Sequence, residues 1–192
     1  MFIRISKALT QTLVELNTIK EEEREIYRYG IQQGLIIILN LITIMAIGAL
    51  FRMLWQAIVF IIAFIPLRIY AGGYHAKTYI HCYVFSIILM STMLLVMRCS
   101  ELSNLTCGLL SVISSLFIII LSPVEDSNKP LDARERQVYR KRIYWITILE
   151  LFCAVLSWLL HCYSLLKCMS FTLVVMCFIL ILGLIKNKYI IV

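Results

Sequence analysis

One short segment of the sequence combines a thiol and two imidazoles with two cations. Cys82 follows His81 directly, His75 lies seven residues earlier, and Arg68 and Lys77 stand in the same segment. A thiolate is a strong nucleophile, and an imidazole can accept its proton near neutral pH. Arg68 and Lys77 would support the reaction by stabilising the thiolate. The segment therefore predicts nucleophilic catalysis, with Cys82 as the nucleophile and His75 as its general base.

The spacing of His75 and Cys82 restricts the backbone between them. Seven residues of straight α-helix rise by about 10.5 Å, whereas a base works within about 3 Å of its nucleophile or through one water. The pair Gly72–Gly73 supplies backbone freedom just before these residues. We therefore expect a bent active-site segment over residues 68–82, hinged at the glycines, with His81 as the second candidate base.

Two other interpretations of this segment stay open. In the first, it is an ordinary polar loop, and Cys82 is a packing residue. In the second, His75, His81 and Cys82 bind a metal, although no fourth ligand stands at a regular spacing. We expect neither a metal nor a cofactor. The sequence contains no H-E-x-x-H zinc motif and no G-x-S-x-G serine motif.

Long apolar runs place this segment in a membrane protein. Of the 192 residues, 61% are hydrophobic and 15% are charged, and the mean hydropathy is +0.91. A soluble domain has about 25% charged residues, and a membrane-spanning helix needs about 20 mainly apolar ones. We expect an all-α, polytopic membrane protein of one domain with about six transmembrane helices. They cover residues 31–51, 53–67, 79–97, 105–122, 143–160 and 165–185. The second is either a half-span that ends at Pro66 or a span that continues into the glycine segment.

The lysines and arginines predict the orientation of these spans. Fifteen of the eighteen fall on one side of the predicted spans, and the other side holds Arg52, Arg98 and Lys167. Because cytoplasmic segments are enriched in these residues, we expect both termini in the cytoplasm. The segment 68–82 and a basic loop at 124–142 would then face the cytoplasm as well.

The first 28 residues have a different pattern. Ile5, Leu9, Leu13 and Leu16 recur at helical spacing, and a run of glutamates follows at 21–25. This pattern predicts an amphipathic helix over residues 1–28 that lies on the inner membrane surface. The acidic run is expected to be a solvated face or a cap before the first span.

The basic loop contains six cations that are candidates to hold an acidic peptide. The positive-inside rule and contact with anionic lipids also explain such a cluster, and both interpretations can be true. The six residues are Lys129, Arg134, Arg136, Arg140, Lys141 and Arg142.

Glu150 stands inside the fifth predicted span. A carboxylate at membrane depth requires a partner and is a functional candidate. Arg68 and Lys77 are its candidate partners, and a functional alternative is that it orients His75. The structural alternative is an ion pair that locks two spans together.

Two motifs in the sequence occur together in one known family. The first comprises Arg68, Gly72, Gly73, His75, Ala76 and Cys82, and the second is the stretch Ser122–Leu131. Together they resemble the accessory gene regulator B (AgrB) family, and the resemblance covers nearly the whole chain. It implies an integral-membrane cysteine endopeptidase of a Gram-positive bacterium. Such enzymes process a propeptide of the AgrD type into a cyclic thiolactone or lactone for quorum sensing.

The resemblance also implies roles for individual residues. Cys82 would be the nucleophile and His75 its base, while Arg68 and the glycine pair support them. Lys129 would belong to the second motif, although the family often has a denser lysine run there. The implied location is the bacterial cytoplasmic membrane, with the active site facing the cytoplasm. The expected partners are the propeptide, the lipid bilayer and a second copy of the chain, and no nucleic acid.

Two functions without covalent chemistry are alternatives. One is a small membrane transporter or exporter of peptides, in which the polar segment is a permeation site. The other is a structural membrane partner of a sensor kinase. Both predict that Cys82 can be replaced without loss of peptide processing.

Overall fold

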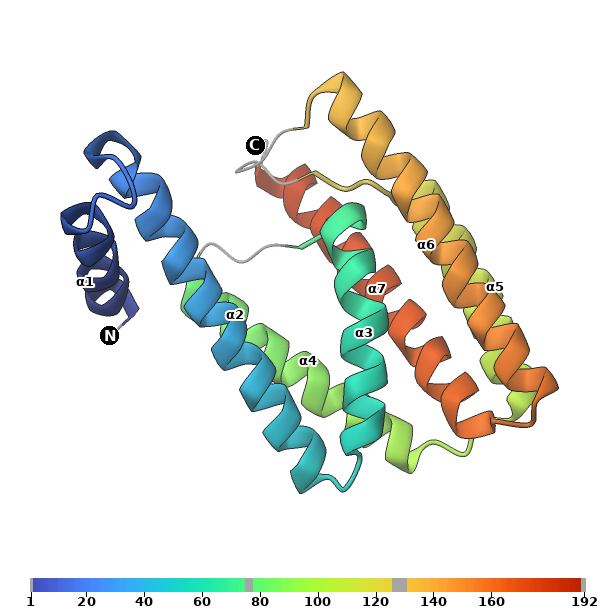
Figure 1. Ribbon diagram of the computed structural model, residues 1–192. Coiled ribbons are helices and arrows are strands. Elements are labelled where there is room, and N and C mark those ends of the chain that lie inside the picture. Colours follow the sequence, from blue (N-terminus) through green and yellow to red (C-terminus); the bar gives the residue numbers. More distant parts are fainter. Residues whose placement is uncertain (1, 75–77, 126–130, 191–192) are drawn as a thin grey trace.

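Helices account for nearly all of the described chain. The structure is a computed structural model that describes residues 2–74, 78–125 and 131–190. The elements, shown in Figure 1, are α1 (Phe2–Glu15), the short 3₁₀ turn η1 (Glu21–Glu23), α2 (Arg24–Leu50), α3 (Leu54–Ala71), α4 (Tyr79–Cys99), α5 (Asn104–Leu121), α6 (Ala133–Leu159) and α7 (Tyr163–Ile190). The last six α-helices are each long and apolar enough to cross a membrane. The predicted all-α polytopic fold is therefore confirmed.

The helix α3 is longer than the span predicted at 53–67. It continues through Pro66 and ends at Ala71, so Arg68 lies in its last turn rather than in a loop. Leu67 and Ala71 are fully buried in the bundle. Tertiary packing of this kind compensates for the hydrogen bond that a proline removes from a membrane helix.

The second half of the predicted loop at 124–142 is also helical, because α6 begins at Ala133. Asp132 caps this helix by accepting a hydrogen bond from the Glu135 N–H at 2.6 Å. The Glu135 carboxylate accepts one from the Asp132 N–H at 3.2 Å in return. This reciprocal pattern is a capping box. The cations from Arg134 onward therefore project from a helix.

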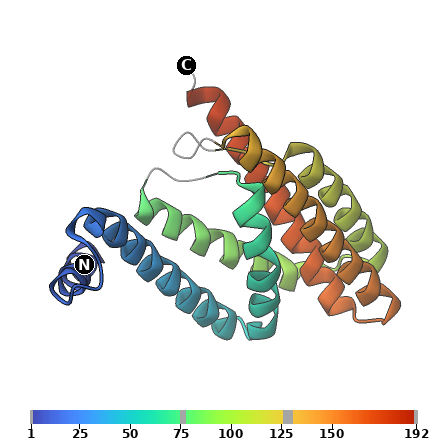
Figure 2. The same cartoon turned by 45° about the horizontal axis from the view of Figure 1, so that its top comes forward.

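The helix α7 lies at the centre of the bundle. It packs against α3, α4, α5 and α6, while α2 packs against α3 and α4 (Figures 1 and 2). More than half of its spanning window is buried, compared with about a third or less for every other span. A segment that packs against α7 is therefore in contact with the most buried of the six spans.

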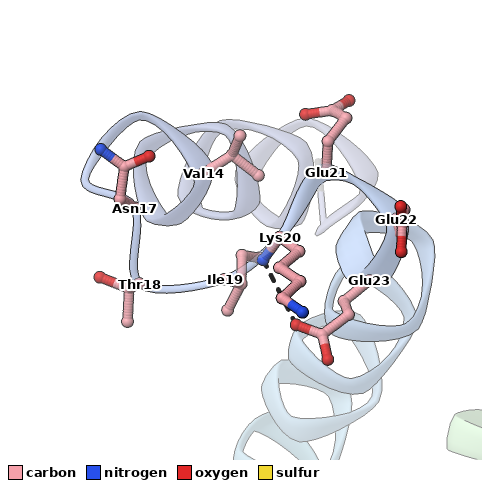
Figure 3. Close-up of a pocket in the computed structure, with 8 residues that line it drawn as sticks. All are labelled: Val14, Asn17, Thr18, Ile19, Lys20, Glu21, Glu22 and Glu23. Atoms are coloured by element: carbon pink, nitrogen blue, oxygen red, sulfur yellow. Dashed lines mark hydrogen bonds between the residues drawn. The ribbon is translucent and has the colours of Figure 1, made fainter.

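The amphipathic N-terminal helix is shorter than the predicted 1–28. It ends at Glu15, and Asn17 then adopts a left-handed backbone conformation (φ 52°) that reverses the chain. Figure 3 shows this turn, in which the Glu23 carboxylate accepts a hydrogen bond from the Lys20 N–H at 3.3 Å. The acidic residues thus stand at the start of α2, where the helix dipole favours negative charge. Arg24 donates to Gln11 at 2.5 Å and so ties α1 to α2.

The segments that connect the spans lie at the two ends of the bundle. The turns from α2 to α3, α4 to α5 and α6 to α7 lie at one end, and α3 and α7 finish at the other (Figures 1 and 2). The two motif segments therefore lie at the same end. The cytoplasmic orientation of that end stays a prediction from the charge distribution.

Thiol labelling tests this orientation. Cys162 is exposed in the α6–α7 turn, and Lys141 is exposed at the opposite end. In intact cells, a membrane-impermeant maleimide should label a variant that retains only Cys162. A cysteine-free variant with Lys141→Cys should react only after permeabilisation. The reverse labelling pattern would refute the predicted orientation.

Candidate active site

Cys82 lies in the first turn of α4. Thr78 caps this helix, since its hydroxyl oxygen accepts a hydrogen bond from the His81 N–H at 3.3 Å. The Cys82 N–H then donates to the Thr78 carbonyl at 3.0 Å. The backbone N–H groups that precede Cys82 in this turn have no intrahelical carbonyl acceptor, and the helix dipole is positive there. The Cys82 thiol is exposed, whereas Cys107 and Cys168 are buried.

Cys82 and Arg68 line the same small cavity. Its volume is about 60 Å³, and its polar lining comes from Arg68, Tyr74, Cys82 and Ser86. The apolar part of the lining comes from Phe64, Phe85, Leu89 and Ile179. A space of this size holds a few water molecules or one reacting carbonyl group. The sequence predicts that Arg68 and Cys82 act together, and the cavity brings them together from α3 and α4.

Arg68 fixes the backbone that leads away from α3. Its guanidinium donates hydrogen bonds to the carbonyl oxygens of Gly72 and Tyr74. A guanidinium has five donors in a rigid planar arrangement, which suits it to hold two acceptors in a defined geometry. Arg68 therefore lines the cavity and also fixes the backbone of Tyr74, another of its lining residues.

The glycine pair is required by close backbone contacts. Gly72 and Gly73 both have positive φ angles, of 73° and 100°. A Cβ atom on Gly72 would overlap the carbonyl oxygen of Val124, and one on Gly73 would lie 2.9 Å from the carbonyl oxygen of Ile179. Both positions therefore exclude any residue with a side chain, for conformational and for steric reasons.

Backbone hydrogen bonds join the first motif to the second motif and to α7. The Gly73 N–H donates to the Val124 carbonyl at 3.1 Å, and the Val124 N–H donates to the Ala71 carbonyl at 2.9 Å. The Tyr74 N–H donates to the Ile179 carbonyl of α7 at 3.0 Å. Residues 73 and 74 are therefore fixed by hydrogen bonds to the second motif on one side and to α7 on the other.

A third glycine makes this approach to α7 possible. A Cβ atom on Gly183 would lie 2.6 Å from the Gly73 carbonyl carbon and 2.7 Å from the Tyr74 nitrogen. The sequence interpretation did not include Gly183. A glycine in a membrane span is a signal of close backbone approach, but its contact partner cannot be inferred from the sequence.

The second motif is anchored by Glu125. Its carboxylate forms an ion pair with Arg136 at 2.5 Å, and its carbonyl oxygen accepts a hydrogen bond from the Asn187 side chain at 2.6 Å. Arg142 donates to the Tyr70 hydroxyl at 2.6 Å and lies over the ring, 5.0 Å from its centroid. Arg136 and Arg142 therefore have partners within the protein. Three of the predicted peptide-binding cations that the structure describes stay candidates for that role, because they are exposed. They are Arg134, Arg140 and Lys141.

Several predicted residues have no described position. His75, Lys77 and Lys129 lie outside the described residues. The distance from His75 to Cys82, and with it the bent geometry and the alternative metal site, stays a prediction. The helix that carries Cys82 begins only at Tyr79. The His81 ring nitrogen Nδ1 contacts the Thr78 hydroxyl, so this histidine is engaged in the helix cap.

Glu150 is buried within the bundle, with 5% of its surface exposed. It lies between the level of Ile143, which packs near Leu67, and the level of Ala154, which packs near Ala63. Neither carboxylate oxygen has a hydrogen-bond partner in the described parts of the chain. The structure gives no contact between Glu150 and Arg68, and pairing with Lys77 or His75 falls outside the described residues.

Comparisons with known proteins agree with the motifs. A family model described as "Accessory gene regulator B" matches residues 4–181, so the family resemblance is confirmed. Two proteins described as AgrB-like, from Clostridium perfringens strains SM101 and 13, are each 24% identical over 169 residues. The alignment covers 84% of this chain and 79% of each relative. No solved structure matches the chain.

The close packing around Gly183 predicts that one added methyl group strongly lowers peptide processing. In Gly183→Ala, the added Cβ displaces residues 73–74, and Tyr74 lines the cavity. A displacement of about 1 Å in an active site can lower the rate by about 100-fold, so peptide processing should fall by at least about tenfold. The control is Gly30→Ala, because no atom lies within 4 Å of that Cβ position. Full processing by Gly183→Ala, measured at equal protein level in membranes, would contradict this packing.

Proposed function

This chain belongs to the accessory gene regulator B family, whose role is the processing of autoinducing peptides, and we propose that it is a cysteine endopeptidase and cyclase. Its substrate is a membrane-bound propeptide of the AgrD type. The cavity shared by Cys82 and Arg68 at the N-terminal end of α4 carries this proposal. It combines an accessible thiol with positive charge in one small space.

The first step forms an acyl-enzyme. The Cys82 sulfur attacks the scissile carbonyl carbon, and the thiol proton passes to His75. Positive charge from Arg68 and from the first turn of α4 stabilises the oxyanion. The carbon–nitrogen bond then breaks, and His75 returns the proton to the leaving amine. The C-terminal tail departs, and the rest of the peptide is held on Cys82 as a thioester.

The second step closes the ring. A cysteine or serine within the bound peptide attacks the thioester carbonyl, and its proton is transferred to the Cys82 sulfur. Exchange between two thioesters is nearly balanced in free energy, so the outcome depends on the proximity of the internal nucleophile. A cavity of about 60 Å³ with mainly apolar walls restricts water and so favours cyclisation over hydrolysis.

The exposed cations at the start of α6 bind the departing tail. Arg134, Arg140 and Lys141 form no ion pair with other described residues. They lie on the helix whose Arg142 contacts Tyr70, at the end of α3 that also carries Arg68. An acidic tail would be attracted to this surface, and anionic lipid headgroups can occupy it between turnovers.

The covalent step has a direct test. The protein is co-expressed with a propeptide of the AgrD type, and its mass is measured for an acyl group on Cys82. The unmodified protein should form the adduct and release the cyclic peptide. Cys82→Ala should form neither, because no other thiol lines the cavity.

Cys162→Ala is the matched control for this test. Cys162 is an exposed thiol at the opposite end of the bundle, so its removal should leave both products unchanged. Cyclic peptide produced by Cys82→Ala at the normal rate would contradict the covalent mechanism. That result would favour a transporter without covalent chemistry.

A further inference from the structure

We propose that an apolar groove between α4 and α7 binds the large apolar side chains that precede the cleaved bond of the propeptide. This inference rests on the proposed function and assigns a binding site to the acyl half of the substrate. It predicts a substrate preference for large apolar residues on the N-terminal side of that bond.

The groove is an open space of about 470 Å³. This volume lies within the range of about 300–1,000 Å³ that is usual for ligand sites. Thr92 is the lining residue with a polar side chain, and every other lining residue is apolar. Ile88, Val96 and Phe178 are exposed along it. The groove therefore selects apolar groups.

The groove is continuous with the cavity at Cys82. Phe85 and Leu89 line both spaces. Along α4, positions 82, 85, 89, 92 and 96 recur every three or four residues, so they share one face of the helix. From Cys82 to Val96 this face extends for about 21 Å. A group attached to the Cys82 sulfur thus lies at one end of the apolar groove.

The covalent intermediate determines which half of the peptide can enter the groove. A cavity of about 60 Å³ holds the reacting carbonyl group and little more, so the residues that precede it must extend out of the cavity. On the side of α3, the charged guanidinium of Arg68 lines the cavity. The groove offers a direct path in the other direction, and it carries no charge that would attract the acidic tail.

Photo-crosslinking identifies the occupant. Val174 of α7, which lines the groove, is replaced by p-benzoylphenylalanine, and Leu95 is replaced in the same way as the control. Leu95 is half-exposed on α4 but does not line the groove. The probe is a biotin-labelled propeptide of the AgrD type, the same one that is used in the test of the covalent step. A propeptide adduct at position 174, and none at 95, is expected. Crosslinks from position 174 to lipid or to a second copy alone would overturn the proposal.

A paired substitution separates this inference from the proposed function. Thr92→Trp narrows the groove, and Leu95→Trp is the matched control. Thr92→Trp should slow acylation of Cys82 by about tenfold with the natural propeptide. It should have little effect with a propeptide that has alanine at the two positions before the cleaved bond. An equal effect on both peptides, or no effect, overturns the groove proposal. Absence of the Cys82 adduct from the unmodified protein overturns the proposed function instead.

Discussion

The close backbone contact of residues 72–74 with Val124 and with α7 is the constraint on which the candidate site depends. At this point three chain segments approach without intervening side chains, because Gly72, Gly73 and Gly183 have none. The hydrogen bonds among them satisfy backbone groups that water cannot reach inside a bundle. The backbone of residues 72–74 and Val124, here called the platform, is thereby held in place.

The position of Cys82, the proposed nucleophile, follows from this platform. Residues 72–74 receive the guanidinium of Arg68 on their carbonyl oxygens and lead toward the start of α4. The Tyr74 ring packs against Phe85, one turn beyond Cys82, with ring centroids 5.2 Å apart. The Lys186 ammonium of α7 lies over the Tyr74 ring, 5.7 Å from its centroid. The central helix thus holds the segment through both backbone and side-chain contacts.

The fold could be predicted from the sequence more completely than the site. Apolar runs of about 20 residues identified all six spans, because length and hydropathy are local properties. Helix ends were less certain: Pro66 suggested an early end to α3, and the charges at 133–142 suggested a loop. Buried packing in the first case and the Asp132 cap in the second determine the actual bounds. The contacts of Gly183 and Glu125 depend on which helices become neighbours, and no local pattern in the sequence contains that information.

Hydrogen exchange at the platform tests its rigidity most directly. The amides of Gly73, Tyr74 and Val124 each donate to a backbone carbonyl of another segment, so they should exchange far more slowly than the amides of an unstructured loop. Exchange can be followed by mass spectrometry on the protein in lipid nanodiscs, with α3 and α7 as protected references. Slow exchange at these three amides is the predicted result. Exchange at the rate of a free peptide, while α3 and α7 stay protected, would contradict the account.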